Sequence, residues 1–337
     1  MFASGIWSDL SDIQDPKLKA LAEHLPRMTL ASRQDKTVRN YLAAFAKWKQ
    51  WCSRFDEVVH LPAKPVYVAL YLLELSQNAK SHSPVTLAYY SISWAHRSAG
   101  LNDPTKGDLP RMVKEASLRT LGHGDNKKEP ISAQAIVNIV NKFVSHDSTL
   151  MDLRVATLCI LGFTGFFRFD EMSKIKFCDI LFAQSYVKIF LEKSKTDVYR
   201  EGEWVYIARL SGAVCPVKVL TAYLTRAGFS GYSEQYIFRG VTRNKVESKH
   251  TLKKQNKPIS YSTARTLVLQ AFQSVGEDPK VLGLHSLRSG GATAAAKSAI
   301  PDRLFRKHGR WHSNMSKDRY VKEDVKQKLV VSRNLGL

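Results

Sequence analysis

The sequence predicts a mostly helical chain of two domains with one small antiparallel β-hairpin. The length of 337 residues suits two domains, and the 44% of hydrophobic residues is enough to build their cores. Apolar residues recur mainly with the helical period of 3.6, and the period changes to two in only one region of the second half. Together these features predict a globular protein of the α class with a minor β element.

The charge predicts a polyanionic partner. The chain holds 51 lysines and arginines against 30 acidic residues, which gives a formal net charge of +21. Nucleic acid is the simplest partner for such an excess, with an anionic membrane as the alternative. The sequence shows no apolar run of roughly 18 residues and no signal peptide, so we expect no membrane association. The cysteines, which form no CxxC pair, predict reduced thiols in an intracellular protein and no zinc site; they are Cys52, Cys159, Cys178 and Cys215.

The first half reads as a compact helical domain. Residues 1–31 form a leader with one possible amphipathic helix. Residues 32–121 contain four helical patterns, and the first places Val38, Leu42, Phe45 and Trp48 on one stripe. The segment "GHGDNKKEP", residues 122–130, has the glycine, mixed charge and terminal proline of a linker.

Residues 131–337 form the second predicted domain. Its helical patterns cover 131–144, 150–167, 215–228, 260–276, 283–297 and 301–309, and the almost wholly apolar 150–167 should be central. Two runs with strand-like alternation, 186–191 and 204–208, are joined by a charged loop and predict the hairpin.

The helix at 283–297 raises a question of charge. Its sequence "GLHSLRSGGATAAAK" has the pattern of a buried helix, yet His285 and Arg288 stand in its first turn. A buried guanidinium needs an anionic partner. No acidic residue lies between Lys280 and Lys297, so the partner must come from elsewhere in the chain or from a ligand.

Several other side chains in this domain could carry chemistry, and each also has an ordinary explanation. Arg168 with Glu171 three residues later could be a structural ion pair, and Lys195 in the hairpin loop a solvated charge. His285 could simply begin a helix, and Trp311 and Tyr320 could be packing residues. Taken singly, each ordinary explanation is favoured.

Taken together, their order and spacing resemble the tyrosine recombinases, also called the phage integrase family. The pattern is Arg, Lys, His-x-x-Arg, Gly-x-Trp and Tyr, with the tyrosine nine residues after the tryptophan. The likeness covers 131–337, and 32–121 resembles the family's helical core-binding domain more weakly. The commoner family pattern has one residue between Thr-Gly and the arginine, whereas this chain has Phe166 and Phe167. The wording of "HSLRSGGATAAA" and "HGRWHS" is most similar to recombinases of eukaryotic mobile elements, the DIRS-like and Crypton-like groups.

The resemblance implies an enzyme that breaks and rejoins DNA through a 3′-phosphotyrosine without metal, ATP or another cofactor. Tyr320 would be the nucleophile, and Arg168, supported by Glu171, would bind the phosphate with Arg288. The scissile phosphate would then be the anionic partner that buried Arg288 needs. Lys195 would protonate the leaving 5′-oxygen, with Lys193 as the alternative acid. His285 would transfer a proton or steer the phosphate, and the Trp311 N–H would donate to a phosphate oxygen; His312 is secondary.

The resemblance also implies partners and an assembly. Double-stranded DNA would be clamped between two basic domains, and four protomers would join two DNA sites, with no membrane or small-molecule substrate. For each basic residue taken singly, a solvated surface charge is the favoured explanation. The candidate phosphate contacts are Lys36, Arg39, Lys47, Lys49, Arg303, Arg306, Lys307 and Arg310. Val325, Leu329 and Val330 in the tail share a helical face, which could pack on its own domain or on a neighbouring protomer.

Two other functions remain open on the sequence alone. A type IB topoisomerase shares the order of arginine, lysine, arginine and tyrosine, but it usually has lysine at the position of His285. A domesticated DNA-binding protein that no longer cuts would need none of these residues. The expected location is the nucleus if the host is eukaryotic, and the cytoplasm or nucleoid if it is bacterial.

Overall fold

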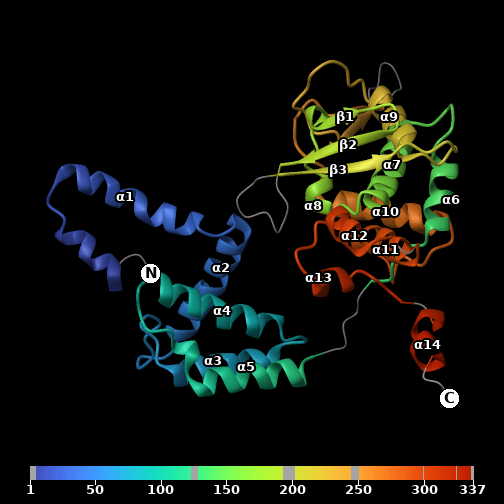
Figure 1. Ribbon diagram of the computed structural model, residues 1–337. Coiled ribbons are helices and arrows are strands. Elements are labelled where there is room, and N and C mark those ends of the chain that lie inside the picture. Colours follow the sequence, from blue (N-terminus) through green and yellow to red (C-terminus); the bar gives the residue numbers. More distant parts are fainter. Residues whose placement is uncertain are drawn as a thin grey trace. The chain divides into compact units, whose positions relative to one another are not determined.

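The computed structural model describes residues 5–122, 128–192, 202–243, 250–298, 300–323 and 325–334 (Figure 1). The chain forms two compact units, Met1–Asn126 and Lys127–Leu337. No helix in these described ranges is long and apolar enough to cross a membrane.

The first unit is entirely helical in its described part. Its elements are η1 (Gly5–Asp12), α1 (Pro16–Ala31), α2 (Asp35–Cys52), α3 (Pro65–Asn78), α4 (Ser83–Ser98), η2 (Pro104–Lys106) and α5 (Asp108–Thr120). Stacked Trp48 and Trp51 of α2 pack against Tyr71 of α3 at the centre of the core. Leu42, which the sequence placed on the buried stripe, is 41% exposed, because the apolar face of α2 turns towards Trp51 and Cys52 instead.

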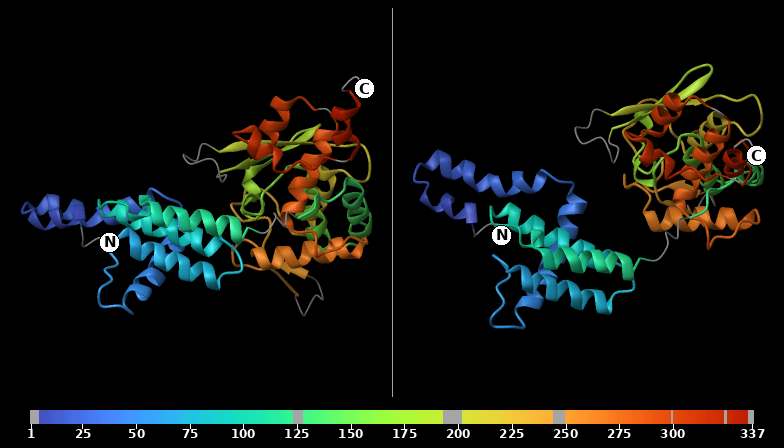
Figure 2. Two further views of the ribbon diagram at one scale, coloured as in Figure 1. Left: turned by 90° about the horizontal axis from the view of Figure 1, so that it is seen from below. Right: turned by 60° about the horizontal axis from the view of Figure 1, so that its bottom comes forward.

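The N-terminal segment, residues 5–31, contacts the rest of this unit mainly through η1. Helix α1 has no buried residue, and Figures 1 and 2 show it extending away from α3, α4 and α5. Trp7 of η1, in contrast, is buried, and its Nε1–H donates to the carbonyl of Ser98 at the end of α4 over 2.7 Å. The Ile6 N–H donates to the carbonyl of Ala99 as well.

The second unit combines helices with two small sheets. Its helices are α6 (Ala133–Phe143), α7 (Leu150–Thr164), α8 (Phe169–Met172), η3 (Phe177–Asp179), α9 (Pro216–Arg226), α10 (Tyr261–Ser274), α11 (Leu284–Lys297), α12 (Asp302–Gly309), α13 (Asn314–Asp318) and α14 (Val325–Arg333). Its strands are β1 (Ile180–Phe182), β2 (Tyr186–Leu191), β3 (Glu203–Ala208), β4 (Val241–Arg243) and β5 (His250–Leu252).

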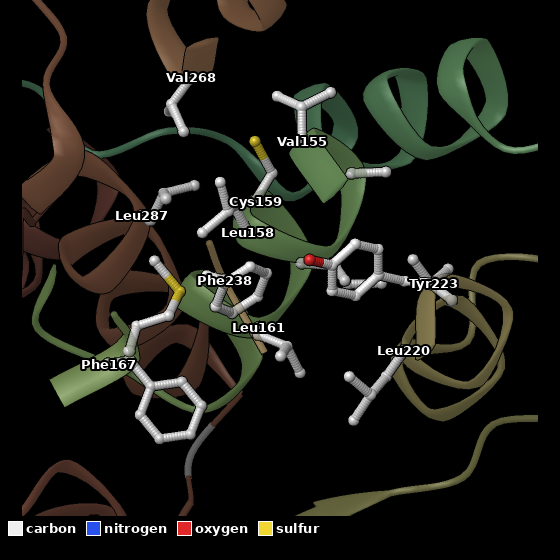
Figure 3. Packing of buried hydrophobic residues seen from close by; sticks show 14 of the residues in the cluster. Val155, Leu158, Cys159, Leu161, Phe167, Leu220, Tyr223, Phe238, Val268 and Leu287 are labelled. Atoms are coloured by element: carbon white, nitrogen blue, oxygen red, sulfur yellow. The ribbon is translucent and has the colours of Figure 1, made fainter. Parts of the chain in front are cut away.

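Helix α7 forms the centre of this unit, as its apolar sequence predicts. Thr149 caps its N-terminus reciprocally with Asp152, and most of its side chains are buried. Figure 3 shows residues of α7, among them Leu158 and Leu161, packed with Tyr223 of α9 and with side chains of α10 and α11. The buried helix provides a rigid support for the residues that follow its C-terminus.

The predicted hairpin corresponds to β2 and β3, which pair antiparallel with Val187 opposite Ile207 and Ile189 opposite Val205. Strand β1 adds to β2, so β3 is an edge strand of the three-stranded sheet. The sequence did not reveal β1, β4 or β5, because three residues are too short to show a period of two.

Two glycines of α11 stand where the helix packs too closely against its neighbours to leave room for a side chain. A Cβ on Gly291 would lie 2.1 Å from the Phe163 carbonyl oxygen, and a Cβ on Gly290 would lie 2.3 Å from that of Ile131. Gly291 therefore lets α11 approach α7 closely, and Gly290 lets it approach the segment just before α6. This packing carries Arg288 into the interior beside the end of α7.

Candidate active site

Three arginines from distant parts of the chain converge on Glu171 of α8. Arg168, which precedes α8, donates from Nη1 to Glu171 Oε1 over 2.6 Å. Arg310, which follows α12, donates from Nη2 to Glu171 Oε2 over 3.0 Å. Arg288 Nη1 of α11 lies 3.9 Å from the same Oε2. Glu171, Arg288 and Arg310 are all buried, and the Arg168 side chain is 13% exposed.

This arrangement corrects the expectation that only a bound phosphate compensates Arg288. Its side chain is fully buried, and it donates from Nη1 to the Phe166 carbonyl and from Nη2 to the Gly309 carbonyl, the latter over 2.5 Å. With Glu171 nearby, the chain itself supplies the acidic partner, from an element 117 positions earlier in the numbering. Sequence pattern within the helix at 283–297 could not identify a partner so far away.

The charges in this cluster influence one another strongly. Burial acts to raise the pKa of Glu171, but Arg310, Arg168 and Arg288 together hold it below its ordinary value. Burial, Arg168 and Arg310 lower the pKa of Arg288 to about 9. Three cations around one carboxylate leave an excess of positive charge at the buried end of the site.

The remaining predicted residues surround the Arg288 guanidinium. Its Cζ lies 4.8 Å from the ring centroid of Trp311 and 4.8 Å from that of Tyr320. The rings of Trp311 and Tyr320 are 5.6 Å apart, and the exposed His285 ring approaches Tyr320 edge-on at 6.5 Å. The structure thus brings together Arg168, Arg288 and these three rings within one protomer.

Two details bear on the reactivity of the rings. The buried Nε1 of Trp311 has no hydrogen-bond partner within the described residues, so its N–H is unused. Half-buried Tyr320 is tied to α11 through Thr293, whose hydroxyl contacts the Tyr320 carbonyl at 3.4 Å and accepts from the Lys322 N–H at 3.1 Å. Sequence reasoning missed Thr293, because no pattern links it to a residue 27 positions away.

Lys195 and its alternative Lys193 lie outside the described residues, in the connection between β2 and β3. In the part of the chain that is described, no group of three or more histidine, cysteine and acidic side chains could hold a metal ion.

Most of the predicted phosphate contacts are exposed, whereas Arg306 is half-buried and Arg310 is buried. Lys36, Arg39, Lys47 and Lys49 are exposed on α2, and Arg303 and Lys307 are exposed on α12. Arg306 is half-buried and donates to Asn314 Oδ1 over 3.2 Å. Arg310 does not fit the prediction, because it is 5% exposed and its Nη atoms bond to Glu171 and to three backbone carbonyls.

This geometry suits a tetrahedral oxyanion. Two planar guanidinium groups match the oxygens of a phosphate and stay charged, and an unused indole N–H can add a third donor. A phenol beside them can act as a nucleophile and an imidazole as a proton carrier. The site therefore holds the groups that a phosphoryl transfer to tyrosine needs.

Known proteins resemble this chain in sequence and in fold. No family model matches the chain. The chain is 29% identical over 296 residues to an integrase/recombinase xerD homolog of Selenomonas ruminantium, which covers 87% of this chain and 83% of that protein. Its fold is similar to XerH site-specific recombinase bound to palindromic difH substrate in a post-cleavage complex, with a TM-score of 0.58, 14% identity and coverage of 89% and 77% of the two chains.

A lambda integrase tetramer bound to a Holliday junction is also similar, with a TM-score of 0.57, 17% identity and coverage of 90% of this chain and 77% of that one. In sequence the chain is similar to an integrase/recombinase, and in fold it is similar to solved structures of a site-specific recombinase and an integrase. The mostly helical fold with small antiparallel sheets, which the sequence predicted, is confirmed by these structures. The likeness to the xerD homolog covers 87% of this chain and therefore extends over both of its units.

Proposed function

We propose that this chain is a site-specific DNA recombinase of the tyrosine type, which cleaves and rejoins duplex DNA through a 3′-phosphotyrosine. One observation carries the proposal: the Tyr320 ring lies against the guanidinium of Arg288, with Arg168 held beside it through their shared neighbour Glu171. Residues 32–121 would be the core-binding domain and 131–337 the catalytic domain, joined by a linker at 122–130.

The chemical steps follow from this arrangement. The Tyr320 oxygen attacks the phosphorus, its proton passes to a base such as His285, and the bond to the 5′-oxygen breaks. The leaving oxygen takes a proton from Lys195, or from Lys193, and becomes a 5′-hydroxyl. Arg168 and Arg288 stabilise the charge that builds on the non-bridging oxygens, and the Trp311 N–H can donate to one of them. Because the phosphotyrosine is an ester, a 5′-hydroxyl can reverse the attack and restore the DNA without ATP.

Arg288 is inaccessible in the described arrangement. The rings of Trp311 and Tyr320 both lie 4.8 Å from its Cζ, and its exposed fraction is 0%. A phosphate can reach this guanidinium only if one of these rings moves, and half-buried Tyr320 is less confined than buried Trp311. The Tyr320 ring would therefore swing aside. We infer that DNA binding drives this movement, which places the phenol next to the phosphate instead of in its place.

DNA binding would rest mainly on phosphate neutralisation by the exposed lysines and arginines of α2 and α12. Each phosphate that a cation neutralises releases bound counterions, so affinity should fall steeply as salt is raised. The net charge of +21 supports this mode of binding. Arg310 takes no part in it.

We propose that strand exchange uses four protomers that join two DNA sites. Leu329 and Val330 of α14 are 38% and 54% exposed, so their apolar side chains are available to a neighbouring protomer. A cavity of about 550 Å³ opens between β3, α11 and α12, and Phe305 and Leu304 form part of its apolar lining. The α14 helix of a neighbouring protomer is the occupant that we propose for this cavity.

We further propose that the chain acts in a mobile element of the DIRS-like or Crypton-like kind, in a nucleus. The "HSLRSGGATAAA" and "HGRWHS" segments support this subgroup. A fluorescent fusion of the full chain in eukaryotic cells tests the location, and exclusion of the fusion from nuclei would contradict it.

The function is tested with a suicide substrate. A nicked duplex that carries the preferred site, selected from a random pool, should trap a covalent protein–DNA adduct with the wild-type chain and none with Tyr320→Phe. A wild-type chain that binds the site without forming an adduct would indicate a DNA-binding protein that does not cut. Relaxation of supercoils by monomers without site preference would indicate a topoisomerase instead.

A further inference from the structure

We propose that Arg310 is a positioning residue that occupies Glu171 and thereby leaves Arg288 and Arg168 available to the scissile phosphate. The inference rests on the proposed function, and it assigns a role to a residue whose charge the sequence attributed to DNA binding. Arg310 cannot itself touch the phosphate, because it is 5% exposed and its two Nη atoms already make four hydrogen bonds.

Arg310 has an unusual backbone conformation. Phe166, with φ 47°, and Arg310, with φ 55°, are the non-glycine residues with positive φ among those the structure describes. Such conformations persist only where the surroundings hold them. These two residues hold each other: Arg310 Nη2 donates to the Phe166 carbonyl over 2.8 Å, and Nη1 donates to the Gly165 carbonyl over 3.2 Å.

Phe166, which belongs to the turn that is longer than in the commoner family pattern, takes part in this contact. The chain has two residues, Phe166 and Phe167, where the commoner pattern has one, and Phe166 adopts the left-handed conformation. The Phe166 carbonyl then accepts from both Arg288 and Arg310. We infer that the longer turn and Arg310 work as a pair, since the turn offers the carbonyl and the arginine fixes the turn.

The charge balance explains why the pair matters to the reaction. Glu171 Oε2 accepts from Arg310 over 3.0 Å and lies 3.9 Å from Arg288, beyond hydrogen-bond distance. Without Arg310 the carboxylate would lack its second guanidinium and would bond to Arg288. Because a bidentate carboxylate competes with phosphate for the same donors, the oxyanion site would weaken.

Arg310 also helps to position the indole of Trp311, because the two residues are adjacent in the chain. Arg310 follows the last residue of α12 as its C-cap, and Trp311 comes next. The carbonyl of Gly309, on the other side, accepts from Arg288. By binding the turn at Gly165 and Phe166, Arg310 therefore fixes the segment that carries Trp311 relative to the end of α7.

The experiment compares cleavage and DNA binding in three variants. Arg310→Gly keeps the left-handed backbone, which glycine adopts without strain, and removes the arginine side chain together with its guanidinium. We expect its DNA dissociation constant to stay within about threefold of wild type, while adduct formation at saturating suicide substrate slows between about tenfold and a hundredfold. Arg310→Lys keeps a cation beside Glu171, so it should cleave faster than Arg310→Gly, because the carboxylate retains a partner other than Arg288.

Arg154→Gln is the matched control. Arg154 is 4% exposed and donates to the Arg239 carbonyl, so its loss disturbs an equally buried arginine that is bonded to backbone. All assays are run below the unfolding transition of each variant, measured by circular dichroism. Arg154→Gln should cleave at the wild-type rate.

Three results would overturn the inference while leaving the proposed function intact: undiminished cleavage by Arg310→Gly, an equal loss of cleavage in Arg154→Gln, or cleavage by Arg310→Lys that is no faster than that by Arg310→Gly. Absence of an adduct with the wild-type chain would overturn the proposed function, and this inference with it. The wild-type reaction thus separates the two failures.

Discussion

Replacing Glu171 by glutamine should destabilise the second unit strongly. The carboxylate is 4% exposed and lies within 4 Å of three guanidinium groups, at 2.6 Å from Arg168, 3.0 Å from Arg310 and 3.9 Å from Arg288. The variant keeps the shape of the side chain but leaves the buried guanidinium groups of Arg288 and Arg310 and the partly buried one of Arg168 facing one another. Such a cluster lacks the charge that makes its burial possible.

The size of the effect follows from these distances. At an effective dielectric constant of about 20, unit charges separated by 3.0 Å attract by about 5 kcal/mol. The desolvation of the ions already opposes much of this attraction, and removal of one partner of a buried pair typically costs about 3–5 kcal/mol. For a unit of roughly 200 residues, that loss lowers the midpoint of thermal unfolding by about 6–20 °C.

The assay is urea and thermal unfolding of the full chain, followed by circular dichroism. Asp170→Asn is the control, because Asp170 precedes Glu171 in the same helix but its side chain is 80% exposed, in an ion pair with Lys174. We expect no measurable change from Asp170→Asn. The reasoning is refuted if Glu171→Gln unfolds at the same denaturant concentration as the control.

Three further outcomes are expected. The pKa of Glu171 is depressed in the folded chain, so its contribution to stability is present above the ordinary glutamate pKa and is lost as pH falls through the depressed value. The free energy of urea unfolding should therefore decrease more towards low pH in wild type than in Glu171→Gln. Gly291→Ala should destabilise by about 1–3 kcal/mol, since its Cβ would lie 2.1 Å from a carbonyl oxygen, whereas Gly212→Ala meets nothing within 4 Å and should show no such loss on thermal unfolding. Leu329 and Val330 are exposed, so Leu329→Ser combined with Val330→Ser should leave the midpoint of thermal unfolding unchanged. The double substitution should reduce the pairing of two DNA sites in a gel-shift assay, because it removes the apolar side chains offered to a neighbouring protomer.

Elements with a long, clear period could be predicted from sequence. The apolar 150–167 predicted a central helix, and α7 is buried along most of its length. The alternation at 186–191 predicted β2 with its correct bounds, because the pattern of alternate burial is complete there. Strands of three residues gave no comparable signal, and in α2 the stripe was misjudged at Leu42, because helical spacing alone does not tell which side of a broad apolar face points inward.

The residue types of the candidate site could be predicted from sequence, but their electrostatic arrangement could not. Arg168, Arg288, Trp311 and Tyr320 do lie together. The burial of Arg310 was missed, because "HGRWHS" looks like an exposed basic turn unless one knows that the arginine side chain folds inward from a left-handed residue. Contacts between residues 139 positions apart, such as Arg310 with Glu171, depend on the folded chain alone.

The arrangement of charge suggests why the phenol covers the arginine. A fully buried guanidinium with one acid shared among three cations would bind any small anion that reached it. The Tyr320 ring lies 4.8 Å from the Arg288 Cζ and provides the negative face of its π-system in place of water or an ion. A neutral aromatic ring holds this position more weakly than a phosphate would, because a phosphate carries a full charge and matches both forks of the guanidinium groups. The same side chain can therefore protect the anion site without DNA and yield it to the scissile phosphate, and its displacement then leaves the nucleophile beside the group that it must attack.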